Sequence, residues 1–377
     1  MKIVDEFAVK SKLEWGEQKC QVMQVGKKTE TPNEWKLGDK NIKNTTSYKY
    51  LGDTITDNNR NKRNLEIREN RVQGTIIQIN TTASSDIMRG IETKVILVLY
   101  ETSIVSGLVH NGESWTLSRA DERQIDQIGI RAIKRLFSLP TSTPSAAVLY
   151  SLSLLYMTQV IDRMRFIYLL KVLNRNNDHW TKQMMNHLKN LNIGWTKNIQ
   201  EKLTKYEMET NWEIIGRKSK AEWKKEVERA VDKQNNKKLI EDCTSKTKNG
   251  IKINTKSKSI HEKLISPEYK RQPLKEIIHG TKQRTKTLLL ARHGMLECGA
   301  NLKGTIPEMC RKCNVVDNEY HRINECRNYT QTNLADSLEK CKFSEVYSED
   351  ESILDKVIEN LERVWEFRYA NGRMKKT

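Results

Sequence analysis

Residues 310–326 read CRKCNVVDNEYHRINEC, which places three cysteines and one histidine in the pattern C-x2-C-x7-H-x4-C. Three thiolates and one imidazole form the complete ligand set of a tetrahedral structural zinc site, whereas a catalytic zinc keeps one position open. The pattern therefore predicts a structural Zn²⁺ bound by Cys310, Cys313, His321 and Cys326. The alternative is a pair of buried thiols beside unrelated surface residues.

Basic and aromatic residues lie between and beside these four ligands. Guanidinium and ammonium groups bind phosphates, and aromatic faces stack on bases, in proteins that bind single strands. The candidate nucleic-acid contacts of this segment are Arg311, Lys312, Tyr320, Arg322 and Arg327. Acidic residues in the same segment dilute the positive charge, so we expect this module to bind weakly by itself.

The whole chain is strongly basic. Its 377 residues include 66 Lys and Arg against 48 Asp and Glu, a formal charge of +18. Such an excess favours a polyanionic partner, with RNA or DNA ahead of an anionic membrane surface. Residues 245–286 carry half of the excess and are expected to follow the phosphates of a nucleic acid. A solvated linker remains the alternative for this run, as does a basic protein without a polyanionic partner for the chain.

The sequence predicts a protein of the nucleus or cytoplasm that is not secreted. Seven cysteines in a long chain do not form the disulfide framework of a small secreted domain. The N-terminus lacks the apolar run of a signal peptide. The most apolar stretch, Val95 to Val109, is too short for a membrane span and contains Glu101, so no membrane partner is expected.

The fold class expected is mainly α, with a few short strands near the N-terminus. Residues 18–26 alternate as a short strand, residues 35–42 as a hairpin, and residues 47–56 as a strand in which Gly52 marks a bulge or a close backbone approach. From residue 60 the period becomes helical. A buried helix is expected to present Ile87, Ile91, Val95, Leu99, Ile104 and Leu108.

Several later helices have recognisable caps and faces. Ser118 and Asp121 form a capping box before a helix whose inner face is Ile125, Ile128, Ala132 and Leu136. Its outer face is expected to offer Arg131, Lys134 and Arg135 to nucleic acid. A long helix over 156–174 is expected to point Arg165 outward, and residues 175–240 form polar helices with isolated tryptophans. A helix from Arg284 to about Cys298 leads into the zinc segment, and its Arg284 and Arg292 are candidate nucleic-acid contacts. An amphipathic helix ends the chain.

Motifs of enzyme chemistry are mostly missing. The sequence has no G-x-x-x-x-G-K-[ST] phosphate loop and no G-x-S-x-G nucleophile elbow. Its adjacent acidic residues do not border an apolar strand that would hold two carboxylates over two metal ions. No catalytic residue is therefore assigned.

Ordered along the chain, these stretches resemble the C-terminal part of the reverse transcriptase polyprotein of non-long-terminal-repeat retrotransposons. The resemblance covers residues 1 to about 330, is weak over 175–280, and is most specific at YLG (50–52), GESW (112–115) and the zinc ligands. It implies that Lys19 lies beside the nucleotide site and that Tyr50, Leu51 and Gly52 form a primer-grip hairpin. It also implies a helical thumb against the template–primer duplex and a zinc knuckle that grips template RNA or target DNA.

The resemblance suggests five parts. They are a palm remnant with a primer-grip-like hairpin (1–58), a thumb-like helical domain (59–175), a basic helical connector (176–283), a helix with the zinc knuckle (284–335) and a C-terminal amphipathic helix (336–377). In the family, which consists of RNA-directed DNA polymerases, the catalytic aspartates lie upstream of the stretch that matches residue 1. We therefore expect a truncated element product that does not polymerise DNA by itself.

The expected function is to grip template–primer or target nucleic acid: RNA, DNA or an RNA–DNA hybrid. The remainder of a reverse transcriptase polyprotein is a possible further partner. Two alternatives stay open at this point. One is a zinc-stabilised module that binds other proteins, and the other is a relic reading frame without a selected function.

Overall fold

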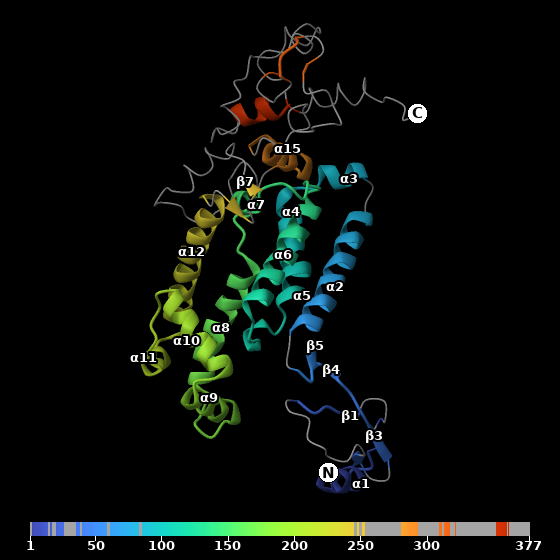
Figure 1. Ribbon diagram of the computed structural model, residues 1–377, viewed down its shortest axis with the longest axis vertical. Helices are drawn as coiled ribbons and strands as arrows, with labels where there is room; N and C mark the ends of the chain where they lie inside the picture. The colour runs from blue at the N-terminus through green and yellow to red at the C-terminus, as the bar shows by residue number, and fades with distance from the viewer. Residues whose placement is uncertain are drawn as a thin grey trace.

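The computed structural model describes residues 2–13, 16, 20–25, 35–37, 40–58, 61–82, 85–244, 247–248, 251–252, 280–292, 309–310, 313–316, 321, 352–359 and 361. These residues are mostly helical with a few short strands, so the broad fold class expected from the sequence is confirmed. The molecule is elongated, with the N-terminal strands at one end, helices along its middle, and α15 (Lys282–Arg292) towards the other end (Figure 1).

The N-terminal end combines one helix with a small sheet. Helix α1 covers Lys2–Lys10, and the sheet has the order β1-β3-β2. Strands β2 (Trp35–Leu37) and β3 (Lys40–Asn44) pair antiparallel, which confirms the hairpin expected over 35–42, while its turn lies outside the described residues. Strand β1 is Gln21–Val22 and pairs parallel to β3, so the strand expected over 18–26 is shorter in the described residues.

Residues 47–56 form a second hairpin rather than one strand. Strands β4 (Ser47–Tyr50) and β5 (Asp53–Thr56) pair antiparallel, with Tyr50 opposite Asp53. The two turn residues both have left-handed backbone, with φ of 46° at Leu51 and 95° at Gly52. A two-residue turn of this hand matches the twist of its strands and favours glycine. Gly52 therefore reverses the chain, so the expectation of one strand with a bulge was wrong. The hairpin that the resemblance implies at residues 50–52 is present, while its role as a primer grip stays a prediction.

The apolar segment after helix α2 (Lys62–Thr81) is broken into short helices. They are α3 (Ser85–Gly90), α4 (Thr93–Leu99), the π-helical η2 (Tyr100–Val105) and α5 (Ser106–Val109). Glu92 has extended backbone and separates α3 from α4. The buried face is Ile96, Tyr100, Ile104 and Leu108. The predicted stripe is confirmed at Ile104 and Leu108 and was wrong at Ile87 and Val95, which are exposed.

The segment Thr93–Ser114 is long and apolar enough to cross a membrane, judged by length and composition. The expectation that the run from Val95 to Val109 is too short for a membrane span was therefore wrong, because the helical segment is 22 residues long. Of its most apolar window, 33% is buried inside the fold, and the core helix of a water-soluble protein passes the same test.

The centre of the molecule is built from α6 (Arg119–Leu136), α7 (Ser145–Ser151) and α8 (Met157–Leu173), preceded by the short η3 (Gly112–Ser114). The capping box of α6 is confirmed, because Ser118 Oγ accepts from Asp121 N at 3.2 Å and Asp121 accepts from Ser118 N at 2.9 Å. All four predicted inner residues of α6 are buried. Arg165 on α8 is also buried, so its predicted outward position was wrong.

Four helices pack along one side of this centre. They are α9 (Trp180–Leu191), α10 (Gly194–Lys205), α11 (Trp212–Arg217) and α12 (Lys220–Thr244). The packing face of Trp223, Val227 and Val231 is buried, and Trp223 Nε1 donates to the Phe166 carbonyl at 2.7 Å. The sequence-based interpretation of this tryptophan as a core residue is thereby confirmed.

Strands β6 (Thr247–Lys248) and β7 (Ile251–Lys252) lie in the basic run before α15, of which Gly280 and Thr281 are also described. Helix α15 docks on the α3–α4 junction through the backbone. Thr93 N donates to Gly280 O at 2.8 Å, and Lys282 N donates to Ile91 O at 2.6 Å. Residues 352–359 are helical, and Leu354, Val357 and Leu361 are buried, as the amphipathic pattern of the tail predicts within the described residues.

Candidate metal centre and nucleic-acid interface

The two neighbouring cysteines lie on a tight backbone turn. Cys310 N donates to Val315 O at 2.8 Å, and Asn314 N donates to Cys310 O at 2.8 Å. Asn314 has left-handed backbone (φ 52°), which asparagine adopts more readily than most residues. Met309 and Val316 close the turn as an antiparallel bridge. The backbone thus folds as a knuckle with Cys310 and Cys313 three positions apart on it.

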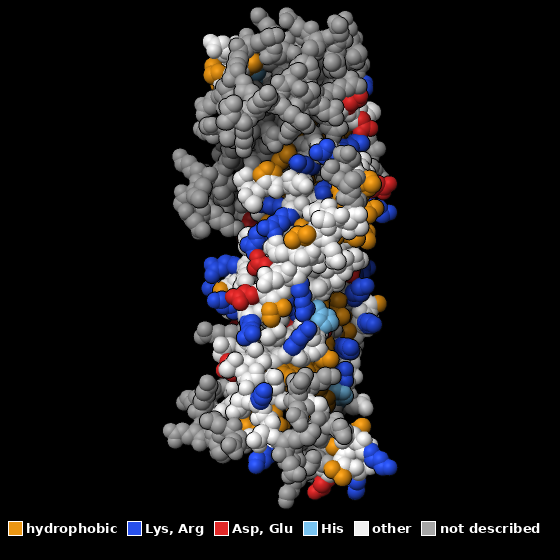
Figure 2. Space-filling view, turned by 90° about the vertical axis from the view of Figure 1, so that its right-hand side faces the viewer, with side chains coloured by type: hydrophobic (Ala, Val, Ile, Leu, Met, Phe, Trp, Pro, Cys, Tyr) orange, Lys and Arg blue, Asp and Glu red, His pale blue; other side chains and the backbone are white. Residues whose placement is uncertain are grey.

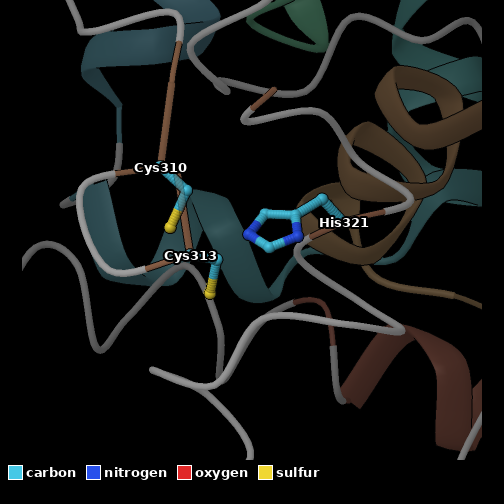
Figure 3. A group of neighbouring side chains, drawn as sticks. All are labelled: Cys310, Cys313 and His321. Atoms are coloured by element: carbon cyan, nitrogen blue, oxygen red, sulfur yellow. The ribbon is translucent and has the colours of Figure 1, made fainter. Parts of the chain in front are cut away.

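The histidine expected as third ligand meets these two thiols. The ligand atoms of Cys310, Cys313 and His321 all lie within 4.8 Å of one another, and their side chains converge (Figure 3). In a tetrahedral zinc site with bonds of about 2.0–2.3 Å, neighbouring ligand atoms are about 3.5 Å apart, so a small inward movement suffices for a common ion. These three residues could bind a metal, and Cys326 lies outside the described residues.

Helix α15 contacts the helical residues 352–359 through an ion pair and is part of the same hydrophobic core. Arg284 of α15 forms an ion pair with Asp355 of the helical residues 352–359. Leu288 and Leu289 of α15 and Leu354 belong to the hydrophobic core of the molecule. Arg284 was predicted to contact nucleic acid, and the structure engages it with a carboxylate of its own chain instead.

The β4–β5 turn presents two apolar side chains to solvent. Tyr50 is 58% exposed and Leu51 is 73% exposed. The Leu51 carbonyl accepts from Asn111 Nδ2 at 3.1 Å, and His110 Nε2 lies 3.3 Å from the same oxygen. A Cβ placed on Gly52 would lie 3.2 Å from the His110 ring, so the turn packs closely there. The turn is anchored by its backbone and leaves its side chains available for a partner.

A buried arginine fixes this hairpin to the helices. Arg68 of α2 pairs with Asp53, donates to the Gly107 carbonyl at 2.7 Å, and stacks on Trp115 at 4.6 Å from the ring centroid. Asn64 also donates to Asp53, at 3.1 Å. Burial lowers the pKa of Arg68 and the Asp53 carboxylate opposes that shift. Sequence reasoning missed Arg68 and Asp53. Arg68 interrupts the apolar stripe of α2, and a charged residue at such a position signals a buried ion pair.

The basic residues expected on one face of α6 have three different environments. Arg135 is exposed, and Arg131 pairs with Glu69 at 2.5 Å. Lys134 is buried, and its ammonium donates to the Thr141 carbonyl at 3.0 Å. Its place on the outer face was therefore wrong, because it lies between the buried Ile133 and Leu136 on a helix that is covered on more than one side. Lys134 cannot contact a phosphate while it is buried.

We expect the substitution Lys134→Met to stabilise the protein at neutral pH. Burial lowers the pKa of Lys134 from 10.5 to about 8. An unfolded lysine keeps its proton up to about pH 10.4, so the unfolded state binds more protons between pH 8 and 10.5 and stability rises with pH there. The gain at pH 7 should be on the order of 1 kcal/mol, discounted for solvent screening. The urea midpoint should increase from pH 7.5 to pH 10 in the wild type and should increase less in the variant.

For the remaining predicted nucleic-acid contacts, the structure does not describe the side chain. Six residues are outside the described part, and for Arg292 only the backbone is described. The six are Lys19, Arg311, Lys312, Tyr320, Arg322 and Arg327. Within the described part, the β4–β5 hairpin lies beyond one end of α2, and α15 lies near the other end (Figure 1). Among the described residues, the predicted contacts of the β4–β5 hairpin and of α15 therefore lie towards different ends of α2.

Comparisons with protein-family models, with curated proteins and with solved structures return no match to this chain.

Proposed function

We propose that this chain binds nucleic acid along its length, chiefly through phosphate contacts. The observation that carries the proposal is one face of the described part of the molecule, on which basic side chains outnumber acidic ones. Lys and Arg side chains recur along this face, and Asp and Glu are sparse (Figure 2). Phosphate contacts of this kind give affinity with little sequence preference.

Helices α2, α3 and α4 contribute described residues to the basic character. Their exposed basic residues are Lys62, Arg63, Arg71, Arg89 and Lys94. Among the side chains described there, Glu66 of α2 and Glu92, between α3 and α4, are exposed acidic residues. The exposed Tyr50 of the β4–β5 turn lies beyond the α2 end of this face and supplies an aromatic ring that can stack on a base.

In this proposal a zinc ion stabilises the fold of the segment from Cys310 to Cys326, which forms one end of the interface. Cys310, Cys313 and His321 supply two thiolates and an imidazole, and Cys326 completes the set of four. Zinc bound by four protein ligands has no open position for substrate, so its role is structural. The reverse transcriptase resemblance supports an RNA–DNA hybrid or an RNA duplex as the preferred partner.

A second candidate is a module that binds proteins through exposed helices. It is favoured by apolar side chains on α9, where Trp180 is 71% exposed and Met184 and Leu191 are also exposed. Such contacts depend little on salt, whereas phosphate contacts release counterions and weaken steeply as salt rises.

The test is the binding of a labelled RNA–DNA hybrid to the full chain across a salt series. Neutralising about six phosphates predicts roughly a thousand-fold loss of affinity between 50 and 200 mM salt. A zinc chelator should weaken binding further at each salt concentration. The charge-removing variant Arg63→Gln/Arg71→Gln should lower the salt slope, and Lys171→Gln, exposed on α8, serves as the control. Absence of binding at 50 mM salt would leave the protein-binding module as the better account.

A further inference from the structure

A polar cavity lies among α6, α8, α10 and α12, apart from the hairpin, the basic face and the metal centre. Its volume is about 430 Å³, within the range of about 300–1,000 Å³ found for small-ligand sites. Five cationic and three acidic side chains line it, together with polar groups that include Gln159 and Tyr206. The proposed nucleic-acid interface uses none of them.

The three carboxylates of the cavity are already satisfied by partners within the protein. Asp162 accepts from Arg165 at 3.2 Å, from Lys202 at 3.0 Å and from Tyr206 at 2.9 Å. Lys202 also pairs with Glu122. Burial lowers the pKa of Lys202, but the two carboxylates outweigh this and leave that pKa raised, so Lys202 stays charged.

The third carboxylate belongs to Asp126. It accepts from the Thr158 backbone N at 2.9 Å and from Lys238 at 2.5 Å. Burial raises the pKa of Asp126, and Lys238 counteracts that shift. With every acid engaged by a donor, the cavity has no carboxylate left over for an added cation.

Three cationic side chains at the cavity form no ion pair with a carboxylate among the described residues. Arg119, Arg123 and Lys205 are exposed, and among the described residues none of them pairs with a carboxylate. The lining therefore carries a surplus of positive charge towards the solvent side. A surplus of this kind attracts an anion.

Inside the cavity, Gln159 has a donor without an acceptor. The residue is 2% exposed, and its Oε1 accepts from Tyr156 N at 3.3 Å. Its amide nitrogen Nε2 is buried and has no hydrogen-bond partner among the described residues. Leaving a buried donor unpaired costs about 1–3 kcal/mol, so an acceptor supplied by a ligand would recover that loss.

We propose that this cavity binds a phosphate group, which accepts a hydrogen bond from Gln159 Nε2 and is neutralised by Arg119, Arg123 and Lys205. A phosphate monoester carries close to two negative charges and three acceptor oxygens, which suits several cations and one amide donor at once. The phosphate can come from a free phosphate compound or from the 5′-phosphate end of a nucleic-acid strand. Both sources present the same group.

The experiment is equilibrium dialysis of radiolabelled inorganic phosphate against the full zinc-loaded chain at constant ionic strength. We expect saturable binding of one phosphate per chain. The variant Gln159→Glu keeps the oxygen that accepts from Tyr156 N and replaces the amide donor by a negative oxygen, so phosphate affinity should fall at least tenfold. The double variant Arg123→Gln/Lys205→Gln should cause a similar loss without altering a buried residue.

The control is Lys171→Gln, which removes one exposed charge from the same helix as Gln159 and should bind phosphate like the wild type. Melting temperatures show whether each variant folds. If Gln159→Glu does not fold, the double variant tests the proposal instead. The proposal is overturned if no saturable binding occurs, or if the double variant binds phosphate as well as the control.

Competing oligonucleotides identify the source of the phosphate. Displacement of the label by a 5′-phosphorylated strand but not by its 5′-hydroxyl counterpart supports the site with a strand end as its ligand. Retention of the label against both strands supports the site with a free phosphate compound as its ligand.

Discussion

We expect the wild-type chain to bind one zinc ion and the variant Cys313→Ser to lose it. A serine hydroxyl is a poor replacement for a thiolate, and ligand binding to structural zinc supplies on the order of 10 kcal/mol of local folding free energy. Zinc content of purified protein should fall from one ion per chain to near zero. Hydrogen exchange should accelerate in residues 309–316 and in α15, whereas the buried core of α6 and α8 should keep its protection.

Two further cysteine variants make this result specific. Cys20, half-buried near β1, is distant in sequence from the metal centre, so Cys20→Ser should keep one zinc per chain. Cys326→Ser should lose zinc as Cys313→Ser does if Cys326 is the fourth ligand. A Cys313→Ser protein that retains stoichiometric zinc would show that the three converging side chains do not hold the ion.

The variant Asp162→Ala is expected to destabilise the protein by about 3–5 kcal/mol, the typical cost of removing one partner from a buried ion pair. Asp162 is 2% exposed and is the carboxylate shared by Arg165, Lys202 and Tyr206. Its removal leaves the buried Arg165 guanidinium without its counterion. Since domains are typically stable by about 5–15 kcal/mol, this loss should show as a large drop in the urea midpoint.

A matched pair on the surface provides the control for this measurement. Glu207 pairs with Lys233 at 2.5 Å, and both side chains are more than half exposed. Exposed ion pairs contribute little because water screens them, so Glu207→Gln should leave the urea midpoint unchanged. The double variant Asp162→Leu/Arg165→Met, which removes both charges, should recover part of the loss. Equal midpoints for Asp162→Ala and Glu207→Gln would contradict a stabilising role for the buried cluster.

Local patterns in the sequence predicted local structure well. The capping box at Ser118, the inner face of α6 and the packing of Trp223 all depend on residues within a few positions of each other, and the structure confirms them. The knuckle at Cys310 and Cys313 is similarly local. His321 joins them across a short span of sequence, and the spacing alone indicated that.

The misses are charged residues that the fold buries and one turn between two short strands. Lys134, Arg165 and Arg68 were read as ordinary charged residues or passed over, and all three are buried. Arg165 and Arg68 are buried because carboxylates and carbonyls satisfy them. Some of these partners are distant in sequence, such as the Gly107 carbonyl for Arg68 and the Trp115 carbonyl for Arg165. Their positions within apolar stripes were the available signal. The alternation pattern missed the turn at Gly52 because alternation continues on both sides of a two-residue reversal, whereas the resemblance implied a hairpin there.

The docking of α15 on the α3–α4 junction has a consequence for synthesis of the chain. The backbone of Thr93 is bonded to Gly280, and its hydroxyl lies 2.6 Å from that of Thr285, 192 positions later. At about 5–20 residues per second, a ribosome needs roughly 10–40 s to make the intervening chain. Throughout that interval the α3–α4 junction is without its native partner. A nascent chain stalled before residue 280 should therefore be a better substrate for chaperones or proteases at this junction than the completed protein.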